Sequence, residues 1–537
     1  MSKLGTGCVA ARGGRLLLGL LAVVPGAVIA QEAPSEVSAV RIIGYAVSGN
    51  TLLPGPVVQA ALGAPPQSAQ LTDLEAAAQR LQRAYRAAGY GAVVVGIPPQ
   101  AITEGRVRIE VIEGRLRQTL VTGNKAFSRE NVLRSLPSLR TGETPRLDRL
   151  DRELLMANDN PSKSARVVFQ RGAQSGDVEA LVIVEEQPPL RWQLMLDNTG
   201  TPGTGRLRAS ALYQNANVGD ADAVVGLRVG TSPTHPSQVA VLAGTVRVPI
   251  YAQGVALEGS LVASSTRAAT NATPAGELRF AGQGYSAGAR GVWLLPSLGV
   301  AKSQAFAGVD VRTYRNDCSL GDFGSEGCGP AGVSVNVLPL AIGRSWQWPG
   351  RASVTVQAIG NLALGEAGDD TRFAASRPGA NSRYRLLRLS AQGTERASPT
   401  RQFAWRADAQ YSRKPLVNAE QLGAGGAATV RGYEERAVAG DSGVIGSLEW
   451  REAPVDVGLP EGTVLSLFGD AARISNRGEA PCAAGRTACS IWSVGAGVSM
   501  RVLSSIFVHV DLARAGRAAA ATRGGAWRLH ANLTWNL

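Results

Sequence analysis

The sequence predicts a mostly β fold: two small α/β modules in tandem, followed by a C-terminal sixteen-stranded antiparallel β-barrel that spans a membrane. Three features lead to this prediction. The last segment alternates strictly between apolar and polar residues, similar segments fill residues 190–537, and a repeated unit precedes them. Glycine is abundant, with 64 residues, which favours strands and turns over helices.

The N-terminus has the pattern of a secretory signal peptide over residues 1–30. Three basic residues flank the start of a short apolar run at 16–24, and Val28-Ile29-Ala30 offers a cleavage site. No later stretch approaches the ~18 consecutive apolar residues that a membrane helix requires. Residues 31–38 then form a short linker, in which we expect no helix that could plug a pore.

Residues 39–187 read as two copies of one unit. A short strand-like stretch runs into Gly49-Asn50 in the first copy and into Gly123-Asn124 in the second, and each Gly-Asn pair predicts a turn. A helical pattern follows. In the first copy its apolar face is expected to consist of Leu71, Leu74, Ala78, Leu81, Tyr85 and Ala88.

Each copy closes on a strand with an acidic end. Residues 107–113 mostly alternate, whereas residues 178–186 are apolar in the middle, which predicts burial on both faces. The apolar positions are explained by core packing. The edge of such a small sheet can also accept an extended guest strand through backbone hydrogen bonds.

The predicted barrel follows residues 187–189, where two prolines end the second unit. An even number of strands near sixteen suits a barrel with a wide, watery lumen. The strands are expected to begin near Arg191, Gly205, Ala223, Gln238, Gly254, Gly284, Gln304, Val333, Arg351, Arg385, Gln402, Val444, Val464, Ser490, Ser505 and Trp527.

The final strand carries the clearest membrane pattern. From Trp527 to Leu537 every odd position is apolar and every even position is polar, so one wall can face lipid and the other water. An aromatic residue near the tip fits the membrane interface. Taken alone, this segment could also be the edge strand of a soluble sandwich.

Four cysteines remain after the signal, as two close pairs: Cys318 with Cys328, and Cys482 with Cys489. Such pairs predict local disulfides in an oxidising compartment. Both pairs fall in connections from an odd to an even strand, which face outward if the front units lie in the periplasm. No histidine is near them in sequence, so we expect no metal site.

The longest glycine-rich connection, residues 413–441, joins the predicted strands eleven and twelve and contains Val430-Arg431-Gly432-Tyr433. On strand thirteen, Phe468 and Asp470 share the predicted lumen face. A carboxylate there can accept two hydrogen bonds from an arginine on a loop folded into the pore. The residues alone also allow a solvated carboxylate and an exposed arginine.

Glu449 and Arg451 are expected to point inward from strand twelve. They are either solvated charges of the lumen or a brace for the inserted loop.

With this constellation the chain resembles a two-partner secretion transporter of the TpsB type, in the haemolysin/haemagglutinin secretion-activation family of POTRA-plus-barrel proteins. Val430-Arg431-Gly432-Tyr433 resembles the family's loop motif, Phe468 and Asp470 its partner motif, and residues 197–205 its first strand and loop. Ala472 stands where the partner motif usually ends in glycine, which predicts altered packing of the loop.

The resemblance implies POTRA modules at 39–113 and 114–188 and a barrel at 189–537. It implies an outer-membrane pore of a Gram-negative bacterium that binds an unfolded secreted exoprotein in the periplasm and translocates it to the surface. The inward loop would be anchored by Arg431, Gly432, Tyr433, Phe468 and Asp470. Expected partners are the exoprotein and outer-membrane lipid, around a monomeric barrel.

Two other transport-related functions remain open: an insertase that assembles other membrane proteins, and a passive porin. A porin explains the barrel but not the two front modules. Nucleic-acid binding is disfavoured, because the net charge of +13 is spread over the chain without a basic stripe that alternates with aromatic residues.

An enzyme is the function class that the sequence supports least. Gly440-Asp441-Ser442-Gly443 resembles the nucleophile turn of some serine proteases, but a serine triad needs a base and an orienting acid within reach. His235 is expected in a loop, and His509 and His530 on barrel strands. We interpret the motif as a turn that leads into strand twelve, and we expect no cofactor.

Overall fold

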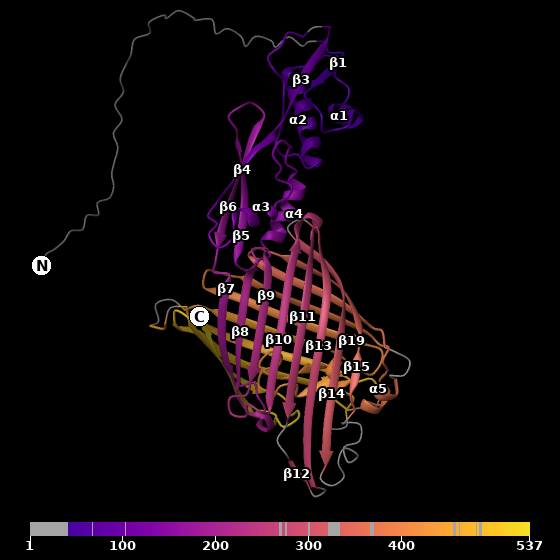
Figure 1. Cartoon of the computed structure of the whole chain (residues 1–537), viewed down its shortest axis with the longest axis vertical. Helices are drawn as coiled ribbons and strands as arrows, with labels where there is room; N and C mark the ends of the chain where they lie inside the picture. Colours follow the sequence, from indigo (N-terminus) through magenta and orange to yellow (C-terminus); the bar gives the residue numbers. More distant parts are fainter. Residues whose placement is uncertain are drawn as a thin grey trace, which may run out of the picture.

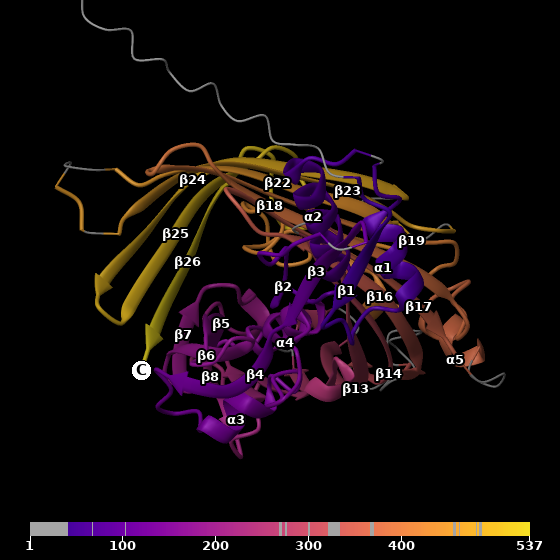
Figure 2. The same cartoon turned by 90° about the horizontal axis from the view of Figure 1, so that it is seen from above.

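The computed structural model describes residues 41–66, 68–102, 104–267, 271–273, 276–298, 301–320, 333–365, 370–454, 458–460, 462–478, 481–482 and 486–537. The signal peptide, the short linker and Cys328 lie outside these residues. Two small modules are stacked on one end of a barrel, with the first module farther from it (Figure 1). In the view from above, the modules project over part of the barrel (Figure 2).

The first module is a three-stranded sheet in the order β1-β3-β2, with β1 parallel and β2 antiparallel to β3. Helix α2 packs its apolar face, including Leu81 and Tyr85, on this sheet, but Leu71 is 57 % exposed. The expectation for Leu71 was wrong because it is the first residue of the helix, outside the packed turns. The elements are β1(Gly44–Ser48), α1(Gly55–Leu62), α2(Leu71–Ala87), β2(Val93–Gly96) and β3(Arg106–Glu113).

The second module repeats this arrangement, with the sheet order β4-β6-β5. The central strand β6 buries one face and leaves the other half-buried, so it is not buried on both faces as predicted; the helices cover one side only. The elements are β4(Arg115–Thr122), α3(Arg129–Arg134), α4(Leu147–Ala157), β5(Lys163–Arg171) and β6(Asp177–Glu186).

In each module, the segment at the Gly-Asn turn is hydrogen-bonded to the acidic end of that module's central strand. Gly49 and Gly123 have positive φ, and a Cβ on either would lie 2.1 Å from a backbone oxygen of the sheet. Glu113 accepts a hydrogen bond from the backbone N–H of Leu52 at 2.9 Å. Glu186 accepts one from Ala126 at 2.7 Å. The two modules therefore share this turn-to-glutamate hydrogen bond as well as their sequence pattern.

Sixteen main strands close the barrel, which confirms the prediction. They are β7(Leu190–Asp197), β8(Arg208–Val218), β9(Ala223–Thr231), β10(Val239–Ile250), β11(Val255–Arg267), β13(Gly276–Leu298), β14(Ala301–Leu320), β16(Pro339–Trp348), β17(Ala352–Ala363), β18(Arg385–Arg396), β19(Arg401–Ser412), β22(Ser442–Glu452), β23(Val464–Ser475), β24(Ala488–Leu503), β25(Ile506–Ala515) and β26(Trp527–Asn536).

Several strand starts differ from the prediction. β13 begins at Gly276, eight residues before the expected Gly284, because β13 and β14 continue beyond the neighbouring strands as a long hairpin (Figure 1). Cys318 consequently lies on β14 rather than in a connection, and Cys489 lies on β24 because that strand begins at Ala488, two residues before the expected Ser490. Short elements also lie in the connections: η1(Pro202–Thr204), η2(Tyr251–Gln253), β12(Asn271–Thr273), β15(Val335–Val337) and α5(Asp370–Ser376).

The barrel closes between its first and last strands, β7 and β26, from Asp197 paired with Asn532 to Gln193 paired with Asn536. Asn198 extends this seam, since its amide donates to the carbonyl of Leu529 at 2.9 Å and accepts from the N–H of Ala531 at 2.9 Å. The side chains of β26 alternate between the outer and inner walls as predicted. Trp527 is 62 % exposed on the outer wall, whereas His530 is buried inside the barrel.

Among the helices of the described residues, none combines the length and the apolar composition that a bilayer-crossing helix needs.

The second module is fixed to the barrel through the β8–β9 turn. The Lys163 ammonium of β5 lies 2.5 Å from an Asp222 carboxylate oxygen, and both side chains are buried. Lys163 also donates to Asn131, and Tyr251 donates to Asp222 at 2.5 Å. Burial lowers the pKa of Lys163, while the Asp222 carboxylate offsets part of that effect.

The Lys163–Asp222 pair should hold the module to the barrel. Lys163→Met leaves Asp222 buried without its cation, a change that typically costs ~3–5 kcal/mol. We expect faster protease cleavage at residues 187–190 in detergent micelles, followed on gels. Arg166→Met, at an exposed position of the same strand, is the matched control. The double variant Lys163→Met/Asp222→Asn should recover much of the resistance. Equal cleavage of the Lys163 and Arg166 variants would contradict this role.

Candidate functional site

The connection between β19 and β22, residues 413–441, folds back along the inside of the barrel. It begins with η5(Asn418–Glu420) and contains a small hairpin of β20(Leu422–Ala424) and β21(Val438–Gly440). Between the two strands of this hairpin, the backbone N–H of Gly426 donates to the Val430 carbonyl at 3.1 Å, which closes a tight turn at the tip of the loop. This tip presents Arg431 to the middle of β23.

Arg431 makes a two-pronged contact with Asp470. Its Nε and Nη2 donate to the two carboxylate oxygens at 2.8 and 2.9 Å, and its backbone N–H donates to the same carboxylate at 3.0 Å. Arg431 is 7 % and Asp470 3 % exposed. The structure therefore brings together the two residues that the sequence paired. Water has little access to either partner.

Further charges surround this pair. Arg431 Nη1 also lies 3.0 Å from Glu449 and 3.4 Å from Asp511. Its guanidinium stacks on the Phe468 ring, 3.3 Å from the ring centroid, where cation–π attraction adds to the ionic contacts. Arg451 binds the second oxygen of Glu449 at 2.7 Å. Glu449 therefore contacts Arg431 directly, whereas Arg451 reaches Arg431 only through Glu449, and a bracing role for the two stays a prediction.

Gly432 and Tyr433 fix the loop to β26, to β24 and to the connection between β25 and β26. The Gly432 N–H donates to Nε2 of His530 on β26 at 3.1 Å, and Gly432 has a φ of +90°, a conformation that favours glycine. Tyr433 is fully buried. Its hydroxyl lies 3.1 Å from the carbonyl of Trp492 and 2.9 Å from that of Arg517.

An apolar cluster continues from the loop into the wall. Val430 and Tyr433 belong to it, and Ala472, the departure from the family motif, lies within it at 5 % exposure. The alanine methyl is thus accommodated in the contact between loop and wall. The other buried members are Ala424, Val438, Ile445, Ile474, Cys489, Ile491, Ala515 and Ala519.

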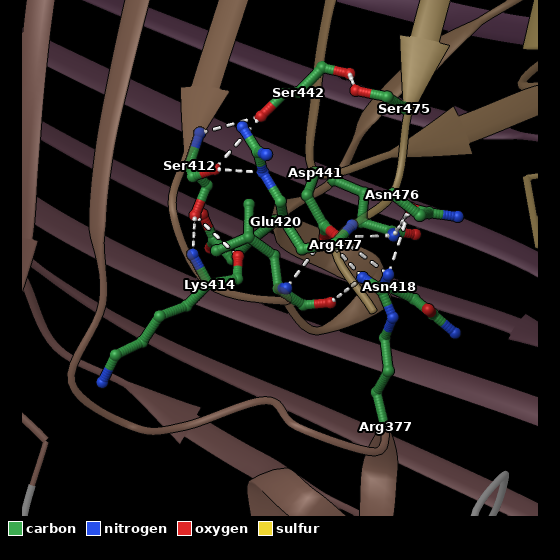
Figure 3. Close-up of polar contacts among 12 residues, drawn as sticks. Arg377, Ser412, Lys414, Asn418, Glu420, Asp441, Ser442, Ser475, Asn476 and Arg477 are labelled. Atoms are coloured by element: carbon green, nitrogen blue, oxygen red, sulfur yellow. Dashed lines mark hydrogen bonds and ion pairs between the residues drawn. The ribbon is translucent and has the colours of Figure 1, made fainter. Parts of the chain in front are cut away.

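A second buried ion pair lies at the base of the loop (Figure 3). Arg377, directly after α5, binds the fully buried Asp441 through both ends of its guanidinium, with Nη2 at 2.9 Å. Asp441 also accepts backbone N–H bonds from Leu416 at 2.8 Å and Arg477 at 2.7 Å. One carboxylate therefore ties together three outer connections of the barrel.

The serine motif belongs to this structural base. Asp441 is committed to Arg377, and the Ser442 hydroxyl lies 3.2 Å from the Ser412 carbonyl and accepts from the Ser412 N–H at 3.1 Å. These contacts agree with our interpretation of residues 440–443 as a turn that leads into β22.

Sequence reasoning missed His530, Asp511 and the Arg377–Asp441 pair as parts of the site. Strand alternation already places His530 on the inner wall, and it could have placed Asp511 there as well. It could not show that a loop about a hundred residues away along the chain would reach them, nor that Arg377, directly after α5, would bind Asp441.

Two of the cavities inside the barrel bear on this site. One of about 420 Å³ lies between the tip and β17–β19, with Thr429 and Arg431 in its lining. Another of about 620 Å³ lies nearer the modules and is lined largely by uncharged polar side chains. There Asp159 of the second module enters the barrel mouth, 3.0 Å from Arg247 and 3.1 Å from Gln304.

The structure contains a disulfide between Cys482 and Cys489, whose Cα atoms are 6.1 Å apart. The predicted partner of Cys318 lies outside the described residues. In the described part of the chain, no three or more His, Cys, Asp or Glu side chains gather in a way that could hold a metal ion.

Comparison with known families gives two matches. Residues 179–499 match the family described as haemolysin secretion/activation protein ShlB/FhaC/HecB. Residues 40–114 match the POTRA domain of ShlB type.

Among curated proteins, the heme/hemopexin transporter protein HuxB of Haemophilus influenzae is 28 % identical over 149 residues. That match spans 28 % of this chain and 26 % of the relative, about a quarter of its length. Two solved structures share the fold over nearly the whole chain. CdiB from Escherichia coli has a TM-score of 0.77 at 16 % identity, covering 96 % of this chain and 93 % of that one. CdiB from Acinetobacter baumannii has a TM-score of 0.71 at 14 % identity, covering 94 % and 91 %.

The Arg377–Asp441 pair should hold the base of the loop closed. Arg377→Met removes the cation from a fully buried carboxylate, for which ~3–5 kcal/mol is typical. We expect faster hydrogen exchange in residues 370–384 and 413–441, measured by mass spectrometry. Arg383→Met, exposed in the same connection, is the control, and Arg377→Met/Asp441→Asn should restore part of the protection. Unchanged exchange in the Arg377 variant would exclude this role.

Proposed function

Because this chain belongs to the haemolysin secretion/activation protein ShlB/FhaC/HecB family, we propose that it is the translocator of a two-partner secretion system. It binds one unfolded exoprotein in the periplasm and passes it through the barrel to the cell surface. The protein lies in the outer membrane, with its POTRA modules on the periplasmic side. Transport, without catalysis, is the proposed activity.

The Arg431–Asp470 contact is the observation that carries this proposal most directly. A barrel that must conduct a polypeptide needs a way to stay occupied at rest. The loop supplies the occupant, and the bidentate pair, with two further carboxylates beside Arg431, holds it on the wall. A buried arginine fork is specific in geometry, so the loop returns to one defined position.

The modules supply the proposed exoprotein site. Each three-stranded sheet leaves two edge strands, β1 and β2 in the first module and β4 and β5 in the second. An extended segment of the exoprotein can add to such an edge through backbone hydrogen bonds, without a folded partner surface. Val94 on β2 is 59 % exposed beside that edge and offers an apolar contact to an incoming strand.

We further propose the division of the chain at residues 39–113, 114–188 and 189–537, and a monomeric barrel. A single barrel already combines the modules, the lumen and the loop. Folding of the exoprotein outside the cell then biases the direction of its movement.

Replacement of Arg431 tests the proposal. In Arg431→Ala, Asp470 is left buried without its fork, and the loop loses its main contact with β23. We expect the exoprotein to accumulate in the periplasm while the barrel still inserts, judged by immunoblots of cell fractions and by heat-modifiable gel migration. Arg473→Ala, exposed on the same strand, should secrete normally. Unchanged secretion in the Arg431 variant would remove this residue from the mechanism.

A further inference from the structure

Besides Asp441, the base of the inward loop carries a second buried carboxylate, Glu420, which contacts β14 and β18 of the barrel wall. Glu420 is 1 % exposed and ends η5. Arg312 on β14 donates to its two oxygens at 2.8 and 3.1 Å, and the Tyr314 hydroxyl donates at 3.0 Å. Arg388 on β18 approaches to 3.4 Å. Figure 3 shows Glu420 beside Asp441 within the loop base.

The loop is therefore fixed to two different parts of the wall. Its tip is held by Asp470 on β23 and its base by Arg312 and Arg388 on β14 and β18. A segment held in this way crosses the lumen instead of lining one side of it.

The Glu420 contacts lie between two cavities. Along β14, Lys302 and Gln304 line the 620 Å³ cavity on the module side. Arg312 follows, and then Tyr314 and Asn316 line an outer cavity of about 540 Å³, together with residues 417–419 of the loop. The ion pairs of Glu420 thus separate the module-side space from the outer space.

The two anchors differ in how easily they can part. Arg312 also contacts Asp310 at 2.6 Å, so its charge remains paired when Glu420 leaves. The Arg388 side chain is 35 % exposed, which lets solvent reach this contact. Asp470, by contrast, has a fully buried side chain whose arginine is 8 % exposed. Release at Glu420 leaves fewer uncompensated buried charges than release at Asp470.

We propose that Glu420 is a releasable latch of the loop, whereas Arg431–Asp470 is its permanent anchor. Opening separates Glu420 from Arg312 and Arg388 and joins the two cavities into one passage, while the tip remains on β23. The role of that passage rests on the proposed function, since it is the route that an exoprotein would take. The latch itself is a property of the pore alone.

Electrical recording of the purified full chain in planar lipid bilayers tests the latch. Glu420→Gln keeps the size of the side chain and removes its charge. Hydrogen bonds to charged groups contribute ~1.5–3 kcal/mol, so we expect the fraction of time in a high-conductance state to rise roughly tenfold or more. Arg312→Gln and Arg388→Gln should shift it in the same direction. Glu452→Gln, which alters the more exposed ion pair with Arg401, is the matched control.

The test uses three latch variants, Glu420→Gln, Arg312→Gln and Arg388→Gln, so that it remains decisive if one of them fails to fold. Heat-modifiable gel migration shows which variants have folded. Open time equal to that of Glu452→Gln in every folded latch variant would overturn the proposal. A secretion assay separates this result from the proposed function. A chain that never exports an exoprotein would contradict that function, while its conductance would still decide the role of Glu420.

Discussion

The structure depends on the constraint that a strand in lipid must give all its backbone hydrogen bonds to other strands. Sixteen main strands satisfy it by closing on themselves at the β7–β26 seam, where Asn198 adds two further bonds. Closure creates a lumen too wide for its own side chains to fill. The inward loop occupies that space, and its buried arginine and carboxylates must pair because no bulk water reaches them.

Much of the fold could be predicted because alternation is a local property of the chain. The pattern of residues 527–537 gave the last strand, its lipid face and the inward position of His530 correctly. The prediction made the β13–β14 hairpin too short, because the alternation of apolar and polar residues does not show where a strand extends past the strands beside it. Leu71 was misplaced because helical spacing identifies a face but not the first turn that lies beyond the sheet.

The candidate site could be predicted only where a family resemblance supplied the pairing. Arg431 and Asp470 are 39 residues apart, and the residues alone favoured a solvated carboxylate and an exposed arginine over a contact between the two. Glu420 with Arg312, and Arg377 with Asp441, have no local pattern. Each pair joins segments that only the closed barrel brings together. The sequence therefore shows which residues are charged but not which of them pair with each other. In both cases a carboxylate of the loop base is buried among polar partners from other segments of the chain.

The buried contact between Lys163 and Asp222 has a consequence for how such chains diversify. A module that is fixed to the barrel by a lysine of its own sheet is not an independent building block. Lys163 fits only a barrel whose β8–β9 turn presents a carboxylate at that place, and the turn is tolerable only beneath that lysine. The second module and the first hairpins of the barrel are therefore constrained to change together, whereas the first module lies farther from the barrel and takes no part in this contact.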